Sequence, residues 1–313
     1  MIEINNLVKR YGDIKAVNGI SFTVNDGEVL GFLGPNGAGK STTMNIITGY
    51  LSSTSGSVKV NGHDILEEPE EAKKCIGYLP EQPPLYFDMT VLEYLSFICD
   101  LKKVPKKERK EQLASILSMV KLVDMSDRLI GNLSKGYKQR VGIAQALVGN
   151  PDILILDEPT VGLDPNQILE IRKLIRKLAA KHTVILSSHI LSEIQAVCDR
   201  VVIINQGKVA AIDTLTDLSK RLSGSSRLSL SFKGPYKEVV NKLKAIPGVK
   251  DVNTVVTNDD TSTHQVDIIA DADSGSDTRA AVFYVLSRGG WPMLEFRSKD
   301  PSLEEIFLSI TSA

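Results

Sequence analysis

The segment from Gly34 to Ser41 constrains the fold of this chain more than any other. It reads Gly-Pro-Asn-Gly-Ala-Gly-Lys-Ser and lies between the apolar run Val29–Leu33 and a helical pattern that begins near Thr42. Its glycines let the backbone turn tightly, so that N–H groups point inward at the start of a helix, where the dipole favours anions. Such a loop between a strand and a helix predicts binding of a nucleoside triphosphate.

The side chains of this loop predict a divalent cation as well as phosphate. We expect Lys40 to reach the β- and γ-phosphates. The hydroxyl of Ser41 is the natural ligand of Mg²⁺, because hard cations prefer oxygen and share it with the phosphates. The other loop residues expected to surround the phosphates are Gly34, Pro35, Asn36, Gly37, Ala38, Gly39 and Thr42.

Length and composition favour a two-domain cytoplasmic protein. The 313 residues suffice for one large α/β domain and a smaller second one. A formal net charge of −1 gives no global basic field, so we expect no nucleic-acid partner. The 3 cysteines match no metal or redox spacing, which is typical of a reducing cytosol. We find no secretory signal and no apolar run of about 18 residues, so any transport pathway would be formed by another polypeptide.

Four short apolar runs predict a mostly parallel sheet with helices on its faces. Each run is followed at once by polar residues suited to phosphate chemistry, namely the glycine loop, Gln82, Asp157 with Glu158, and His189. Because ligands of open parallel sheets bind outside the carboxyl ends of the strands, we expect these residues to converge on one edge. The four runs are Val29–Leu33, Ile76–Leu79, Ile153–Leu156 and Thr183–Leu186.

The remaining patterns divide the chain further. Between about Thr90 and Asn150, apolar residues at three- and four-residue steps predict a helical insertion. The polar stretch Ser223–Ser226 predicts a boundary, so we expect domains at residues 1–222 and 223–313. The second domain shows the order of a ferredoxin-like α+β unit, followed by a final helix from Pro301 to about Ile310. Its predicted segments are Arg227–Phe232, Tyr236–Ile246, Val249–Val256, His264–Ile269, Asp277–Ser287 and Met293–Phe296.

The run Ile153–Leu156 ends in two adjacent carboxylates, Asp157 and Glu158. Like charges at a buried edge disfavour each other's ionisation unless a cation or a proton-transfer role compensates. We therefore expect Asp157 to hold Mg²⁺ directly or through water. Glu158 is expected to orient and polarise an attacking water.

The segment Leu133-Ser134-Lys135-Gly136-Tyr137 resembles the Leu-Ser-Gly-Gly-Gln signature of ABC transporter ATP-binding subunits. With the motifs above, the resemblance covers about residues 1–215. It implies a P-loop NTPase fold, an ABC ATPase domain of class α/β with a helical subdomain at about residues 90–150. It also implies that Ser134 and Gly136 lie against the γ-phosphate held by a second subunit. The substitutions at Lys135 and Tyr137 depart from the commonest pattern but leave the serine and second glycine intact.

Other positions take their expected roles from the same resemblance. Tyr11 matches the aromatic residue that stacks on adenine. Gln82 matches the glutamine that contacts Mg²⁺ and the attacking water. Asp164 matches the loop residue that touches the phosphate loop of the partner. His189 matches the histidine that bonds the γ-phosphate.

The resemblance implies an ATP- and Mg²⁺-dependent ATPase that works as a dimer on the cytoplasmic face of the membrane. A second copy of the chain and an integral membrane permease would be its partners. Within the family, Gly77–Tyr86 and Asp300–Leu308 are similar to the multidrug and gliding-motility-associated exporter group, so we expect an exporter.

Two alternatives belong to other classes of protein. A soluble ABC-type ATPase could act on nucleic acid or ribosomes, although the chain has neither a long coiled-coil insertion nor a second cassette. A ligand-sensing C-terminal domain could instead use the ATPase as its switch. We favour a dimerisation or regulatory role for that domain, because no pocket-forming cluster is visible from about residue 224 onward.

Overall fold

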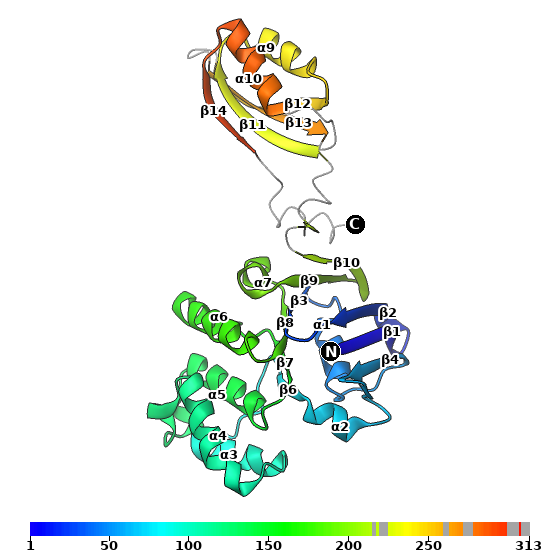
Figure 1. The fold of residues 1–313 in the computed structure, drawn as a ribbon, viewed down its shortest axis with the longest axis vertical. Helices are drawn as coiled ribbons and strands as arrows, with labels where there is room; N and C mark the ends of the chain where they lie inside the picture. Colours follow the sequence, from blue (N-terminus) through cyan, green and yellow to red (C-terminus); the bar gives the residue numbers. More distant parts are fainter. Residues whose placement is uncertain (215–216, 219–224, 259–262, 272–277, 299–306, 308–313) are drawn as a thin grey trace. The chain divides into compact units, whose positions relative to one another are not determined.

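The computed structural model describes residues 1–214, 217–218, 225–258, 263–271, 278–298 and 307. Its contacts divide the chain into two compact units, Met1–Thr214 and Leu215–Ala313, each with its own hydrophobic core (Figure 1). This division comes earlier than the boundary predicted at residues 222 and 223. The reason is that β10 (Lys208–Thr214) pairs with β9 (Arg200–Asn205) up to its last residue, which completes the first unit.

A six-stranded sheet positions the phosphate loop in the first unit. Its strand order is β10-β9-β3-β8-β7-β6, with parallel pairs from β9 to β6 and β10 antiparallel at one edge. β3, β7 and β8 are buried along their whole length, as expected of strands covered on both faces. The four predicted strands are confirmed as β3 (Val29–Leu33), β6 (Ile76–Leu79), β7 (Ile153–Asp157) and β8 (Thr183–Ser188).

A second, antiparallel sheet in this unit was not predicted. Its strand order is β2-β1-β4-β5, and one hydrophobic cluster joins it to the six-stranded sheet. The ring centroids of Phe22 and Phe32, one from each sheet, lie 5.5 Å apart. Helix α1 (Lys40–Ile47) contributes Met44 and Ile47 to the same cluster, so both sheets fix the helix that follows the phosphate loop. The strands are β1 (Ile2–Tyr11), β2 (Ile14–Val24), β4 (Ser55–Val60) and β5 (His63–Asp64).

The predicted helical insertion lies between β6 and β7 (Figure 1). Its first helix begins with a capping box, in which the Thr90 N–H donates to Glu93 Oε2 at 2.8 Å and Thr90 Oγ1 accepts from the Glu93 N–H at 3.3 Å. The insertion contains α3 (Val91–Leu101), α4 (Lys106–Met119), the 3₁₀ turns η1 (Val123–Met125) and η2 (Ile130–Asn132), and α5 (Lys135–Leu147).

Three further helices connect strands of the first unit, and they are α2 (Pro69–Lys74), α6 (Pro165–Ala179) and α7 (Leu191–Val197). The apolar side chains of α6 form one face, with Ile171, Leu174, Ile175 and Leu178 buried. Among the helices of the described residues, none is long and apolar enough to cross a membrane.

The second unit has the predicted ferredoxin-like fold. Its elements follow the order strand, helix, strand, strand, helix, strand, and its antiparallel sheet has the order β12-β13-β11-β14. The helix predicted from Pro301 to Ile310 lies outside the described residues, apart from Phe307. The elements are β11 (Ser225–Lys233), α9 (Tyr236–Lys244), β12 (Val249–Asn258), β13 (Thr263–Asp271), α10 (Thr278–Gly289) and β14 (Met293–Ser298).

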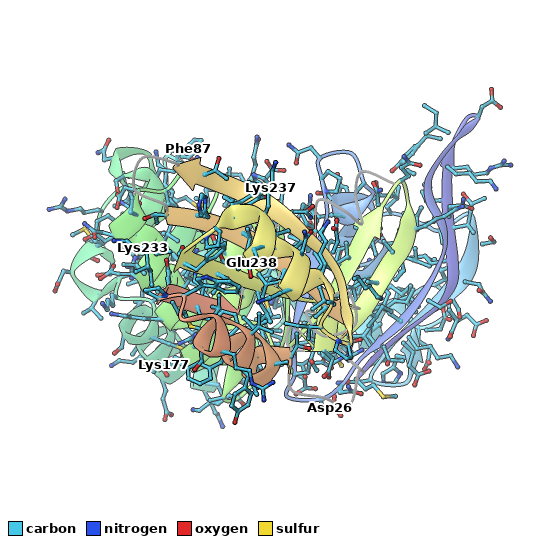
Figure 2. The ribbon with its side chains drawn as sticks, turned by 90° about the horizontal axis from the view of Figure 1, so that it is seen from above. Asp26, Phe87, Lys177, Lys233, Lys237 and Glu238 are labelled. Carbon is cyan, nitrogen blue, oxygen red and sulfur yellow. The ribbon has the colours of Figure 1, made fainter. Side chains whose placement is uncertain are left out.

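Helix α9 shows why this unit forms its own core. Val239, Val240 and Leu243 recur at helical spacing and are buried with the inward side chains of β11 and β13. Lys237 and Glu238 lie on the opposite side of the helix and are exposed to solvent (Figure 2). The binary pattern of one helix thus distinguishes the core face from the solvent face.

Candidate functional site

The phosphate loop closes around the ammonium group of Lys40. Lys40 Nζ donates to the carbonyl oxygens of Gly34 at 2.8 Å and Pro35 at 3.3 Å, and the residue is only 6% exposed. Gly39 caps α1 with a φ of 105°, and a Cβ there would lie 2.4 Å from the carbonyl oxygen of Ala16 on β2. Only glycine fits this close approach, so the unpredicted antiparallel sheet helps to shape the loop.

The two carboxylates predicted to follow β7 are both buried. Asp157 is 2% exposed and Glu158, whose φ is 49°, is 6% exposed. The Glu158 N–H donates to Ser187 Oγ at 3.0 Å, and that hydroxyl in turn donates to Asp157 Oδ1. Ser187 on β8 therefore holds both acidic residues at the edge of the sheet.

Glu158 brings two further predicted residues together. Its Oε1 lies 3.6 Å from Lys40 Nζ, and its Oε2 lies 2.9 Å from His189 Nδ1. A single carboxylate thus contacts the phosphate-loop lysine on one side and the imidazole that follows β8 on the other.

A cavity of about 510 Å³ opens at this point. Its polar lining can donate hydrogen bonds to an anion through backbone N–H groups and the Lys40 ammonium group, as a triphosphate requires. The cavity is lined by Ala16, Asn36, Gly37, Gly39, Lys40, Ser41, Thr42, Glu81, Glu158, Val161 and His189.

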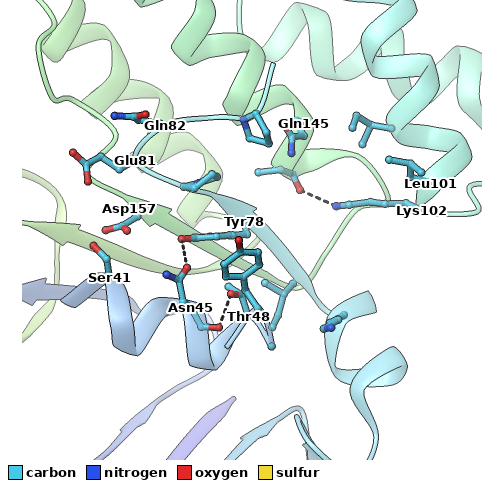
Figure 3. Close-up of a pocket in the computed structure, with 18 residues that line it drawn as sticks. Ser41, Asn45, Thr48, Tyr78, Glu81, Gln82, Leu101, Lys102, Gln145 and Asp157 are labelled. Atoms are coloured by element: carbon cyan, nitrogen blue, oxygen red, sulfur yellow. Dashed lines mark hydrogen bonds between the residues drawn. The ribbon is translucent and has the colours of Figure 1, made fainter. Parts of the chain in front are cut away.

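A larger cavity of about 900 Å³ adjoins the loop on the side of α3 and α5 (Figure 3). Ser41 and Asp157 both line it, and the hydroxyl of Tyr78 donates to Asn45 Oδ1 at 3.1 Å. Burial raises the pKa of Tyr78, and the negative charges of Asp157 and Glu81 raise it further. Tyr78 therefore stays protonated and keeps this hydrogen bond at physiological pH.

The residues predicted for Mg²⁺ fit a cation that is shared with phosphate. Ser41, Gln82 and Asp157, the three residues predicted for Mg²⁺, all line this larger cavity and carry oxygen atoms. In the described part of the chain, no group of three or more His, Cys, Asp or Glu side chains is placed to hold a metal ion.

Sequence reasoning missed Glu81. Glu81 lines both cavities, whereas the predicted residue Gln82 lines only the larger one, among the residues drawn in Figure 3. The carboxylate of Glu81 thus borders the same space as Lys40 and Glu158. Its place as the first charged residue after the end of β6 was the signal that could have identified it.

Seven predicted residues line neither of these two cavities, namely Gly34, Pro35 and Ala38 of the phosphate loop and the more distant residues Tyr11, Ser134, Gly136 and Asp164. Ser134 caps α5 and accepts a long hydrogen bond of 3.5 Å from the Tyr137 N–H. The ring of Tyr11 is 49% exposed, with Lys9 Nζ lying 5.4 Å from its centroid. An exposed hydroxyl at a helix start and an exposed ring are both free to contact another molecule.

The segment around Ser134 lies against the first turn of α6. A Cβ at Gly136 would lie 2.3 Å from Gln167 Oε1, so the amide of Gln167 packs directly on this glycine. Asp164 caps α6 and accepts from the Gln167 N–H at 3.0 Å. The predicted signature and dimer-seam residues are therefore neighbours within one subunit.

The first unit matches a known family. Residues 17–161 match the model of the ABC transporter family. The chain is 34% identical to the linearmycin resistance ATP-binding protein LnrL of Bacillus subtilis (strain 168), over 99% of this chain and 98% of that protein. It is 40% identical to the bacitracin transport ATP-binding protein BcrA of Bacillus licheniformis, over 71% of this chain and 72% of that protein.

Solved structures share the fold. The dimeric structure of MJ0796, a bacterial ABC transporter cassette, aligns with a TM-score of 0.63 and 29% identity over 69% of this chain and 99% of that chain. The same cassette in a post-hydrolysis state bound to ADP and Pi gives a TM-score of 0.62 and 28% identity over the same shares, 69% and 99%. Together with the Lys40–Glu158–His189 cluster, these similarities identify the chain as a member of the ABC transporter ATP-binding proteins, with a P-loop ATPase domain as its first unit.

Proposed function

We propose that this protein is the ATP-hydrolysing subunit of an exporter. The observation that carries the proposal is the convergence of Lys40, Glu158 and His189 on one cavity beside the phosphate loop. Phosphoryl transfer needs mainly positioning and charge stabilisation, and this cluster supplies a cation, a carboxylate and an imidazole at one place.

Each residue of the cluster has a distinct role in this proposal. Lys40 neutralises charge on the β- and γ-phosphates, Glu158 orients and polarises the attacking water, and His189 bonds the γ-phosphate. Mg²⁺ held by Ser41 and Asp157 would neutralise further charge on the phosphate oxygens. Glu81 and Gln82 border this cation site, and the exposed ring of Tyr11 stacks on adenine.

The active form in this proposal is a homodimer. Ser134, Gly136 and Asp164 line neither cavity of their own subunit, so they would meet the nucleotide of a second copy. The dimeric state of the MJ0796 cassette supports this arrangement. Two ATP molecules would lie between the phosphate loop of one subunit and the start of α5 in the other.

A membrane permease is the proposed partner, and it places the protein on the cytoplasmic face of the membrane. The names of LnrL and BcrA connect those relatives with linearmycin resistance and bacitracin transport, which supports export here. The larger cavity offers a docking site, because Tyr50 and Leu101 line it and are 82% and 61% exposed. Glu81 borders both this larger cavity and the smaller cavity beside the phosphate loop, so docking and hydrolysis would influence each other.

Purification of the Glu158→Gln protein from native membranes with MgATP tests this function, with mass spectrometry of the co-purifying polypeptides. We expect a multi-span membrane protein that is released when ATP is omitted. Ribosomal or DNA-binding partners instead would overturn the transport assignment in favour of a soluble ATPase. The Lys40→Ala protein, which should not retain the triphosphate, is the matched control.

A further inference from the structure

We propose that Glu193 is a positioning residue for the catalytic pair Glu158 and His189. The inference rests on the proposed ATPase function and extends it to a carboxylate that lies outside both cavities. Glu193 lies in the first turn of α7 and is 4% exposed. A buried carboxylate at such a place has to be compensated by hydrogen bonds.

The two oxygen atoms of Glu193 accept hydrogen bonds from two hydroxyl groups, one in the loop after β7 and one at the end of β8. Thr160 Oγ1 donates to Glu193 Oε1 at 2.6 Å, and Ser188 Oγ donates to Glu193 Oε2 at 2.8 Å. The same Ser188 hydroxyl accepts from the Ile190 N–H at 3.0 Å, which fixes its orientation. Among the described residues, no lysine, arginine or histidine forms an ion pair with Glu193, so its partners are the two hydroxyl groups.

These hydroxyl groups flank the catalytic residues in the sequence. Thr160 follows Glu158 by two positions, and Ser188 directly precedes His189. Glu193 therefore connects the loop after β7 with the end of β8, next to the 2.9 Å contact between Glu158 Oε2 and His189 Nδ1. Loss of this bridge would let the loop after β7 and the end of β8 move independently.

The backbone of Glu158 makes such support necessary. Its φ of 49° lies in the left-handed region, which is unfavourable for a residue with a side chain. Such a conformation persists only where the surrounding structure holds it. Ser187 Oγ supports the Glu158 N–H directly at 3.0 Å, and Glu193 supports the same loop through Thr160.

The kinetic test compares Glu193→Ala, Thr160→Val and Glu193→Gln in the full-length protein. We expect Glu193→Ala to lower kcat roughly tenfold to a hundredfold, because small displacements of catalytic groups have effects of this size. Thr160→Val removes one of the two hydroxyl groups at constant shape and should lower kcat less. Glu193→Gln should recover most of the rate, because an amide can accept one hydroxyl and donate to the other. KM for ATP should stay within about twofold of wild type in all three variants, since no phosphate ligand is removed.

Glu28→Ala is the matched control for burial. Glu28 is also buried, at 8% exposure, but it pairs with Arg200 and directly precedes β3, at the end of the strand away from the phosphate loop. This variant should lose stability without a change in kcat of the folded fraction. Values of kcat equal to wild type in Glu193→Ala and Thr160→Val would overturn the inference. It would also be overturned if kcat in these variants fell only in proportion to the fraction of folded protein.

A second readout is independent of turnover. The chain has 4 histidines, so ¹⁵N imidazole spectra can be assigned from single substitutions. We expect Glu193→Ala to shift the His189 signals, while His182, whose Nδ1 lies 2.7 Å from the Pro151 carbonyl oxygen, stays unchanged. An unshifted His189 would contradict the positioning role even if wild-type protein hydrolysed no ATP. Absence of ATPase activity in wild type would instead refute the proposed function alone.

Discussion

Glu158 Oε1 lies 3.6 Å from Lys40 Nζ, and both side chains are almost completely buried. The two charges compensate each other beside a loop that also offers Lys40 two carbonyl oxygens. A triphosphate entering this loop would compete for the same ammonium group. Binding of ATP would therefore draw Lys40 away from Glu158 and leave the carboxylate available to a water molecule.

Replacement of Glu158 by glutamine should lower ATP hydrolysis at least about a hundredfold, since the water loses its acceptor while the phosphate loop is unchanged. Affinity for ATP should be kept or increased, because the buried negative charge near the phosphates is removed. Phosphate release and equilibrium ATP binding measure the two effects. Hydrolysis at the wild-type rate would rule out the catalytic role of Glu158.

Substitution of Gly39 by alanine should abolish nucleotide binding and destabilise the protein. The left-handed backbone by itself costs about 1–2 kcal/mol for a residue with a Cβ. At Gly39 that atom would also meet the Ala16 carbonyl oxygen at 2.4 Å. Urea unfolding and ATP titration are the measurements.

The Gly12→Ala variant is the control for Gly39, because Gly12 also has a positive φ, 58°, but a Cβ there has nothing within 4 Å. Its free energy of unfolding should fall only by the backbone contribution of about 1–2 kcal/mol, and its affinity for ATP should be unchanged. Equal losses of stability and of ATP affinity in both variants would mean that the contact of residue 39 with the antiparallel sheet contributes to neither.

Glu81 should contribute more to catalysis than Gln82. The Glu81→Gln variant should lower kcat about tenfold and raise the Mg²⁺ concentration for half-maximal activity, because this carboxylate borders both cavities. The Gln82→Ala variant should change either quantity by less than about threefold. Steady-state ATPase assays across a Mg²⁺ titration provide the comparison, and the reverse order would support the role that the resemblance implies for Gln82.

Ser134 should contribute to ATP-dependent dimerisation and contribute little to the stability of the fold. Its cap on α5 is a long hydrogen bond of 3.5 Å, so Ser134→Ala should cost less than about 1 kcal/mol of stability. The same variant should lose ATP-dependent dimerisation, measured by light scattering. A mixture of Ser134→Ala and Lys40→Ala proteins should recover activity, because the mixed dimer contains one site with an intact loop and an intact serine. No recovery would argue against a site shared between subunits.

The lowered pKa of Glu170 predicts that the stability of the protein depends on pH. A hydrogen bond from Lys121 and the charge of Arg140 lower the pKa of Glu170 from its usual 4.5. Because the folded pKa lies below the unfolded one, the stabilisation is present above about pH 4.5 and disappears as the pH falls through the folded value. The Glu170→Gln variant should therefore unfold more easily than wild type near pH 7, by less than about 1 kcal/mol since Glu170 is 45% exposed, and equally at low pH.

Urea unfolding at both pH values measures this difference. Glu111→Gln provides a control, because Glu111 is exposed and has no ion pair among the described residues. A difference between wild type and Glu170→Gln that grew as the pH fell would show that the ion pair is not the source of the stabilisation.

Features encoded by short stretches of sequence were predictable. The glycine loop, the buried strands and the paired carboxylates after β7 depend on residues that are close together in the chain, so spacing and residue type suffice to identify them. The order of strands and helices in the second unit could be predicted for the same reason, since apolar residues recur within each element at the spacing typical of a strand or a helix. The positions of Lys40, Glu158 and His189 at one edge followed from the rule that parallel strands end together.

Contacts between distant segments were decided by the tertiary structure. Thr160 and Glu193 are separated by 33 positions in the chain, and Ser187 and Glu158 by 29. No local sequence pattern therefore predicts the hydrogen bonds between them. Glu81 and Gln82 are adjacent and both polar, and only the path of the chain after β6 places the glutamate beside both cavities. The sequence by itself determined which chemical groups are present and in which elements they lie. The packing of two sheets and the direction of each loop decided which groups meet, because side-chain contacts depend on three-dimensional positions that local periodicity does not specify.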